Sequence, residues 1–256
     1  MNDETRVKNT YNKYGKNYQN LRDKKHKICN EYLEVPCMIK ALGNIQGKKL
    51  LDVGCGAGIH LKKYISKKAI CSGVDISETM IDFAKKKLPD VEFKVGSMTK
   101  LPYKNNSFDI VTISLSIHYI KDWTFAFKEI NRVLKKDGVL YYSTESPIGI
   151  ARENFENKNI YFRGIGQIID KNTKEKLMVG DCFKQGKFKW EMLPGMIMQT
   201  YRKTFRTQLQ ELRSSGFELI DFIDCKPTSS FKKNDLHAYQ IFSKLPMFSI
   251  FVAKKK

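Results

Sequence analysis

The feature that decides the fold of this chain is the stretch Lys49-Leu50-Leu51-Asp52-Val53-Gly54-Cys55-Gly56-Ala57-Gly58. Its first five residues form a short, mostly apolar run that predicts a strand, and residues 59–66 behind it predict a helix. Glycine lets the backbone turn sharply and approach a ligand with no Cβ atom in the way. Because open α/β sheets bind their ligands at the carboxyl ends of strands, this strand, glycine loop and helix predict a ligand site.

Strand and helix signals alternate on both sides of the loop. Helices are predicted for 77–88, with Ser77 as its N-cap, and for 124–135, which Asp137-Gly138 should end. The predicted strands are 70–74, 91–95, 108–115, 139–143, 217–223 and 248–253, with a further helix at 204–215. Such alternation indicates an α/β protein with a doubly wound, mostly parallel sheet.

Two segments depart from this alternation. Residues 2–42 have a helical pattern with Tyr11, Tyr14 and Tyr18 on one face, and we expect an interruption at Pro36. Residues 147–203 carry several glycines between short apolar runs, which predicts an inserted cap of small antiparallel strands. We therefore divide the chain into an N-terminal helical part (1–46), a ligand-binding core (47–146), an inserted substrate cap (147–203) and a part that completes the core sheet (204–256).

Composition narrows the class of protein. No apolar run approaches the ~20 residues of a membrane span, and the first residues do not form a secretory signal, so we expect a soluble, cytoplasmic protein. Six cysteines without a C-x-x-C pair predict neither a disulfide framework nor a metal site. The net charge of +19 is compatible with RNA or an anionic substrate, but the lysines are scattered rather than clustered, which favours RNA less. Nothing in the sequence indicates an oligomeric state.

One carboxylate has an evident role in this arrangement. Asp75 ends the predicted strand 70–74, next to the first strand. A carboxylate at that place can accept hydrogen bonds from both ribose hydroxyls of an adenosine. A tight turn with a solvent-facing aspartate is the alternative for this pair of features.

The chain resembles the class I S-adenosylmethionine-dependent methyltransferases, in particular the small-molecule branch (methyltransferase type 11) typified by quinone-biosynthesis enzymes. The segments that carry the resemblance are Leu50 to Gly58, Gly73-Val74-Asp75-Ile76-Ser77, Leu101-Pro102-Tyr103, Ser107-Phe108-Asp109-Ile110-Val111 and Arg132-Val133-Leu134-Lys135-Lys136-Asp137-Gly138. The resemblance implies a Rossmann-like seven-stranded sheet whose last strand is reversed, with 248–253 in that place. It also implies that the N-terminal helical part is a lid, and that S-adenosyl-L-methionine is the cofactor and S-adenosyl-L-homocysteine the product.

The resemblance assigns the cofactor-binding residues. Glycines 54, 56 and 58 would line the methionine part, Asp75 would hold the ribose, and Ile76 would contact the adenine. Ser97 and Met98 stand where the family often has an acid for the adenine amino group, so that contact is in doubt here. The full predicted set is Tyr11, Tyr18, Asp52, Gly54, Cys55, Gly56, Asp75, Ile76, Ser97, Met98 and Ser114.

The acceptor side is predicted from position and residue type. His118 follows the fourth strand, and histidine titrates near neutral pH, so it is the candidate general base, with Glu145 as the second candidate. The alternatives are a histidine that only shapes the pocket and a solvated carboxylate. Tyr119, Trp190, Tyr201 and Arg202 are the predicted substrate-binding residues, and Arg202 or Arg163 could pair with an acidic group on the acceptor.

Three other functions compete with methylation of a small molecule or small peptide. An enzyme of the same fold could modify RNA, chiefly tRNA, and a binding protein could keep the cofactor without doing chemistry. A nicotinamide dehydrogenase would carry G-x-G-x-x-G, whereas this loop has G-x-G-x-G.

Overall fold

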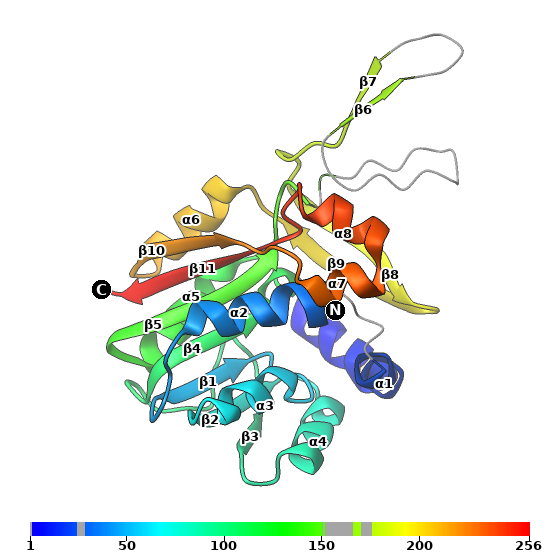
Figure 1. The fold of residues 1–256 in the computed structure, drawn as a ribbon. Coiled ribbons are helices and arrows are strands. Elements are labelled where there is room, and N and C mark those ends of the chain that lie inside the picture. The colour runs from blue at the N-terminus through cyan, green and yellow to red at the C-terminus, as the bar shows by residue number, and fades with distance from the viewer. Residues whose placement is uncertain (1, 25–28, 150, 152–165, 170–175) are drawn as a thin grey trace.

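The computed structural model describes residues 2–24, 29–149, 151, 166–169 and 176–256. Its centre is a seven-stranded sheet in the order β10-β11-β5-β4-β1-β2-β3 (Figure 1). The strands are β1 (Lys49–Val53), β2 (Ile70–Asp75), β3 (Glu92–Val95), β4 (Phe108–Ser114), β5 (Leu134–Glu145), β10 (Phe217–Asp224) and β11 (Phe248–Lys255). Strands β1 to β5 pair in parallel, and β11 is antiparallel to both of its neighbours. The predicted Rossmann-like sheet with a reversed last strand is confirmed.

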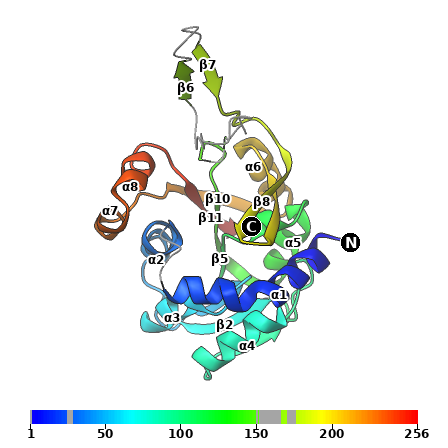
Figure 2. The ribbon, with the colours of Figure 1, turned by 90° about the vertical axis from the view of Figure 1, so that its right-hand side faces the viewer.

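Helices cover both faces of the sheet (Figure 2). Helices α2 (Val35–Leu42) and α3 (Ile59–Ser66) lie on one face, and α5 (Trp123–Val133) and α6 (Phe205–Ser214) lie on the other. Successive strand residues point to opposite faces, so Leu50 joins the core under α2 and α3 while Leu51 joins the core under α5 and α6. Strand β1 is thus packed on both faces, and the glycine loop begins at its carboxyl end.

The N-terminal helix lies across the loop edge of the sheet. Helix α1 (Asp3–Asp23) begins at Asn2, whose side chain accepts a hydrogen bond from the Thr5 N–H at 2.8 Å. It packs on α4 (Glu78–Lys87), which begins at Ser77 as predicted. A π-helical turn, η1 (Asn30–Glu34), runs directly into α2. The expected interruption at Pro36 is wrong, because Pro36 occupies the first turn of α2, where a missing N–H is tolerated.

Small antiparallel strands are present in the inserted segment, as predicted. β6 (Gly166–Ile169) pairs with β7 (Lys176–Val179), and β8 (Gly186–Leu193) pairs with β9 (Met196–Arg202). Strand β9 packs on α1 and on the 3-10 turn η2 (Ile117–Tyr119) through a buried cluster of Val7, Tyr119, Met196 and Met198. This cluster brings the cap over the carboxyl ends of the sheet strands.

Two local predictions failed. Helix α5 ends at Val133, and Asp137-Gly138 does not terminate it but forms an irregularity inside β5, between the pairs Phe108–Leu134 and Ile110–Val139. A turn signal of this kind fits a bulge as well as a helix end. Helices α7 (Ser229–Asn234) and α8 (Leu236–Phe242) were not predicted, although Thr228 and Asp235 cap them. Among the residues that the structure describes, no helix is both long and apolar enough to cross a membrane.

Candidate active site

A cavity of about 460 Å³ opens where the glycine loop, the ends of the parallel strands, α1 and the β8–β9 hairpin meet. Three predicted site residues, Asp52, Gly58 and Tyr201, are absent from its wall. The others line it: Tyr11, Tyr18, Gly54, Cys55, Gly56, Asp75, Ile76, Ser97, Met98, Ser114, His118, Tyr119, Glu145, Trp190 and Arg202. The fold therefore gathers residues more than 190 positions apart around one space, although their contacts with a ligand stay predictions.

The glycine loop is fixed by backbone hydrogen bonds. The N–H groups of Gly54 and Cys55 both donate to the Val74 carbonyl, at 2.8 and 3.1 Å. Gly54 has a φ of 71°, and a Cβ atom there would lie 2.5 Å from Ser116 Oγ. Only glycine fits this combination of backbone angle and close approach, so the sequence requirement at Gly54 is steric.

Asp75 connects the loop to the second strand. Its two carboxylate oxygens accept hydrogen bonds from the N–H groups of Gly56 and Ser77, each at 2.9 Å. Desolvation raises the pKa of Asp75, and these backbone hydrogen bonds oppose the rise. A carboxylate offers about four acceptor positions, so the backbone N–H groups do not use all of them and a ligand hydroxyl can also donate to Asp75.

Asp52 and Tyr201 have partners outside the cavity wall. Asp52 is buried and accepts a hydrogen bond from Thr112 Oγ1 at 2.8 Å, and burial raises its pKa to about 6. The Tyr201 hydroxyl donates to Asp3 Oδ1 at 2.8 Å and so ties β9 to the start of α1. These contacts favour a structural role for Asp52 behind the glycine loop, and one for Tyr201 between β9 and α1.

Two lid tyrosines reach the cavity. The hydroxyls of Tyr11 and Tyr119 are 3.0 Å apart, which joins α1 to η2, and the Tyr11 ring meets the Tyr18 ring edge to face at 5.6 Å. Tyr14 packs instead beside the buried cluster under β9. The helical lid therefore contributes part of the cavity wall itself.

A buried polar cluster at the same edge was missed by the sequence analysis. Glu34 Oε2 lies 2.8 Å from His60 Nε2, while Glu34 Oε1 accepts from the hydroxyls of Ser114 and Ser143 at 2.8 and 2.7 Å. Burial opposes charge on both Glu34 and His60. The ion pair and its hydrogen bonds outweigh burial, so the pKa of His60 is raised and that of Glu34 is lowered. The cavity thus has a charged pair at the end where Ser114 lies.

Arg22 is a second missed residue of this end. Its side chain lines the cavity and is 6% exposed, with one guanidinium nitrogen 2.9 Å from Glu31 Oε1 and another 3.3 Å from the Tyr18 hydroxyl. Arg22 and His60 both line the cavity. Arg22 belongs to no recognisable motif and needs α1 to bring it to the loop, whereas His60 is the second residue of α3, directly after the loop.

His118, in η2, and Glu145, the last residue of β5, line the same cavity as Trp190 and Arg202 of the β8–β9 hairpin, and we call this group of residues the second end. His118 is 6% exposed, and its Nδ1 has no hydrogen-bond partner among the described residues. Burial lowers the pKa of His118, and the charge of Glu145 opposes this. The imidazole is therefore neutral at pH 7 and able to accept a proton.

Arg202 is the cation of this second end. It is 7% exposed, and its guanidinium lies 3.7 Å from the centroid of the Phe188 ring, a cation–π contact. Burial lowers the pKa of Arg202, which the charge of Glu145 opposes. No carboxylate of the described residues lies within ion-pair distance of this guanidinium. Arg163 falls outside the described residues.

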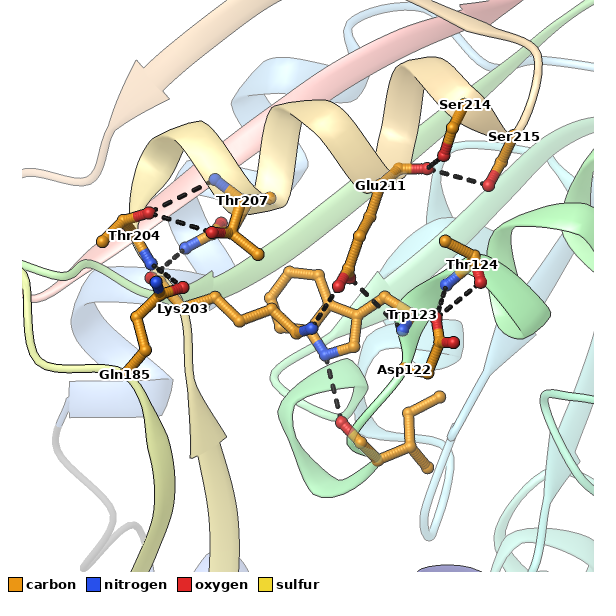
Figure 3. A network of polar contacts seen from close by, with 12 residues as sticks. Asp122, Trp123, Thr124, Gln185, Lys203, Thr204, Thr207, Glu211, Ser214 and Ser215 are labelled. Carbon is orange, nitrogen blue, oxygen red and sulfur yellow. Dashed lines mark hydrogen bonds and ion pairs between the residues drawn. The ribbon is translucent and has the colours of Figure 1, made fainter.

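A polar network next to Arg202 holds this end together (Figure 3). Lys203 forms a partly buried ion pair with Glu211 of α6, and Glu211 also accepts from the Trp123 backbone N–H at 3.3 Å. The Trp123 indole N–H donates to the Ile120 carbonyl at 3.2 Å, just after η2. The end of β9, the start of α5 and the turn that carries His118 are thereby fixed to one another.

In the part of the chain that the structure describes, no group of three or more His, Cys, Asp or Glu side chains could hold a metal ion.

Comparisons with known proteins agree with this geometry. Residues 51–142 match a family model described as a methyltransferase domain. A demethylmenaquinone methyltransferase of Staphylococcus aureus (strain MRSA252) is 30% identical over 200 residues, 75% of each chain. An uncharacterized protein of Haemophilus influenzae is 31% identical over 213 residues, 79% of each chain. The crystal structure of an S-adenosylmethionine-dependent methyltransferase from Mesorhizobium loti has a TM-score of 0.69 and 25% identity, over 86% of this chain and 96% of that one.

Proposed function

Because this chain belongs to the class I S-adenosylmethionine-dependent methyltransferases, we propose that it methylates a small-molecule acceptor bound between the sheet edge and the β8–β9 hairpin. The observation that carries the proposal is one continuous cavity with two chemically different ends. The first end has the glycine loop and Asp75, and the second has aromatic side chains, His118 and Arg202.

The residues of the first end fit S-adenosylmethionine. Asp75 has acceptor positions left for the ribose hydroxyls, Ile76 offers an apolar surface to the adenine, and the cations Arg22 and His60 lie where the amino-acid tail would need a partner for its carboxylate. When bound, the cofactor supplies a methyl group on a positively charged sulfur, which a nucleophile displaces in line.

The second end favours an acceptor with an apolar body and an acidic group. Tyr119, Phe188, Trp190 and Met192 provide an apolar wall, and Arg202 is a buried cation without a carboxylate partner among the described residues. A buried guanidinium favours a carboxylate or a similar anion. The relative named demethylmenaquinone methyltransferase supports a ring-shaped, apolar acceptor.

Proton removal and positioning would come from this chain's own side chains. His118 is held neutral by burial, so it could take the acceptor proton during attack, and the nearby charge of Glu145 would stabilise the imidazolium that forms. Glu145 itself is the second candidate base. Closure by α1 and the cap would exclude water and hold the reacting atoms in line, which supplies much of the rate.

The test is a transfer assay with methyl-labelled S-adenosylmethionine and a cell extract divided into small-molecule, RNA and protein fractions. We expect label in the small-molecule fraction, and none with the Asp75→Ala variant. Ribonuclease-sensitive label would instead assign the enzyme to RNA, which its net charge of +19 makes the main competitor. Binding of S-adenosylhomocysteine without labelling of any fraction would favour a non-catalytic binding protein.

A further inference from the structure

A carboxylate reaches the adenine side of the cavity from the lid helix. The sequence has no aspartate at Ser97-Met98, where the resembling family often carries the acid for the adenine amino group. In the structure Glu4, in the first turn of α1, accepts hydrogen bonds at Oε1 from Ser97 Oγ and from Thr99 Oγ1, the latter at 2.5 Å. Glu4, Ser97 and Met98 all line the same cavity.

The Glu4 carboxylate lies where it could take the role of the acid that is absent at Ser97-Met98. Glu4 Oε1 sits within hydrogen-bond distance of the Ser97 hydroxyl, so it occupies the space that a longer acidic side chain at position 97 would reach. The contacts formed by Glu4 with described residues use Oε1 alone, which leaves Oε2 as an acceptor. Val7, one turn further along α1, and Ile76 add apolar surface to the same part of the wall.

We propose that Glu4 selects adenine by accepting a hydrogen bond from its 6-amino group, an inference that rests on the proposed function. The acid comes from the lid and not from the sheet edge. Adenine recognition is therefore coupled to the seating of α1, because the helix must be in place for the contact to form. A base without the amino group would leave Glu4 Oε2 unpaired in a partly enclosed site, and it would bind more weakly for that reason.

The alternative is that Glu4 only fastens α1 to the core. The chain offers a matched control for this, since Glu78 of α4 also joins α1 to the core. Glu78 lies 2.5 Å from Lys8 Nζ and accepts from Asn12 Nδ2 at 2.7 Å, and it is not part of the cavity wall. Removing either carboxylate weakens the attachment of the lid, but only Glu4 is placed to contact the base.

The experiment measures binding by calorimetry of S-adenosylhomocysteine and of its 6-deamino analogue, which carries purine instead of adenine. We expect the wild type to bind the adenine compound roughly 10- to 100-fold more tightly, as for a hydrogen bond to a charged group. Glu4→Ala should reduce this ratio to about 3 or less, and Glu4→Gln should give an intermediate ratio because its amide oxygen can still accept. Glu78→Ala should keep the wild-type ratio.

If Glu4→Ala weakened the binding of both compounds equally, so that the affinity ratio was preserved, the inference would be overturned. Glu4 would then only attach α1 to the core. Failure of the wild type to bind either compound would contradict the proposed function itself. Circular dichroism of each variant establishes that the loss of preference is measured on folded protein.

Discussion

The two ends of the cavity are built by different means. At the glycine-loop end, the decisive contacts are made by backbone groups: the N–H groups of Gly54, Cys55, Gly56 and Ser77 fix the loop and Asp75. All of these residues lie between positions 54 and 77. At the second end, where we propose that the acceptor binds, the wall consists of side chains from η2, the end of β5 and the inserted hairpin.

This difference shows why one end is easier to infer than the other. Backbone hydrogen bonding in a tight loop requires glycines at fixed places, and that requirement is visible in a short stretch of sequence. A wall of side chains can be assembled from many residue types on segments far apart in the chain. The cofactor class therefore follows from the loop, whereas the acceptor must be argued from the folded cap.

The largest expected effect is a loss of cofactor affinity that occurs for a variant at the glycine-loop end but not for a variant at the second end. Asp75→Ala should weaken S-adenosylhomocysteine binding by about 100-fold, because it removes the acceptor for two hydroxyls and the partner of the Gly56 N–H. His118→Ala should change the same affinity by less than about 3-fold, since His118 lies at the acceptor end. Calorimetry on both variants measures this. Equal losses would mean that the ends are not divided between cofactor and acceptor.

The second prediction tests whether the loop is sterically fixed. Gly54→Ala should lower the free energy of unfolding by about 3 kcal/mol, since it adds an unfavourable φ and a Cβ clash with Ser116 Oγ. Gly47→Ala is the control: its φ of 72° matches the 71° of Gly54, but a Cβ atom there would meet nothing within 4 Å. It should cost about 1 kcal/mol. Urea titration measures both, and equal costs would contradict the close approach in the loop.

The third prediction addresses the acceptor end. Arg202→Met keeps an apolar stem over Phe188 but removes the cation. We expect roughly 10- to 30-fold lower labelling of the small-molecule fraction, with S-adenosylhomocysteine affinity unchanged. Full labelling by this variant would show that the acceptor has no acidic group at Arg202.

The smallest effect concerns pH and the buried pair Glu34–His60. The pKa of His60 is raised above 6.5, so the stability it adds is complete below pH 6.5 and is lost as pH rises through the higher folded value. The pKa of Glu34 is lowered below 4.5, so its contribution is complete above pH 4.5 and is lost as pH falls. The pair is therefore at full strength between about pH 4.5 and 6.5.

We expect the unfolding free energy of the wild type to fall as pH rises above this window, because His60 then loses its charge. The double variant Glu34→Gln/His60→Gln lacks both ionisations and should lose less over the same range. Urea titrations at several pH values compare them. An identical pH dependence in both proteins would mean that His60 is not charged in the folded protein.

The sequence alone predicts the sheet and the loop, because strand burial and glycine placement are local signals. The reversed last strand is implied by the family resemblance. It does not predict Glu4 or Arg22 as site residues, since they reach the cavity only after α1 has packed on the core. His60 directly follows the loop in α3, but its partner Glu34 comes from η1, which is distant in the sequence. Asp137-Gly138 is a further case in which tertiary structure decides the outcome. The pair resembles a helix end, but strand pairing with β4 makes it a bulge.

The most direct measurement is a crystal structure of the protein with S-adenosylhomocysteine. The account predicts the ribose hydroxyls within hydrogen-bond distance of the Asp75 carboxylate, and the sulfur directed toward the end that holds His118 and Arg202. A nucleoside bound elsewhere, or a dinucleotide in this cavity in its place, would contradict it.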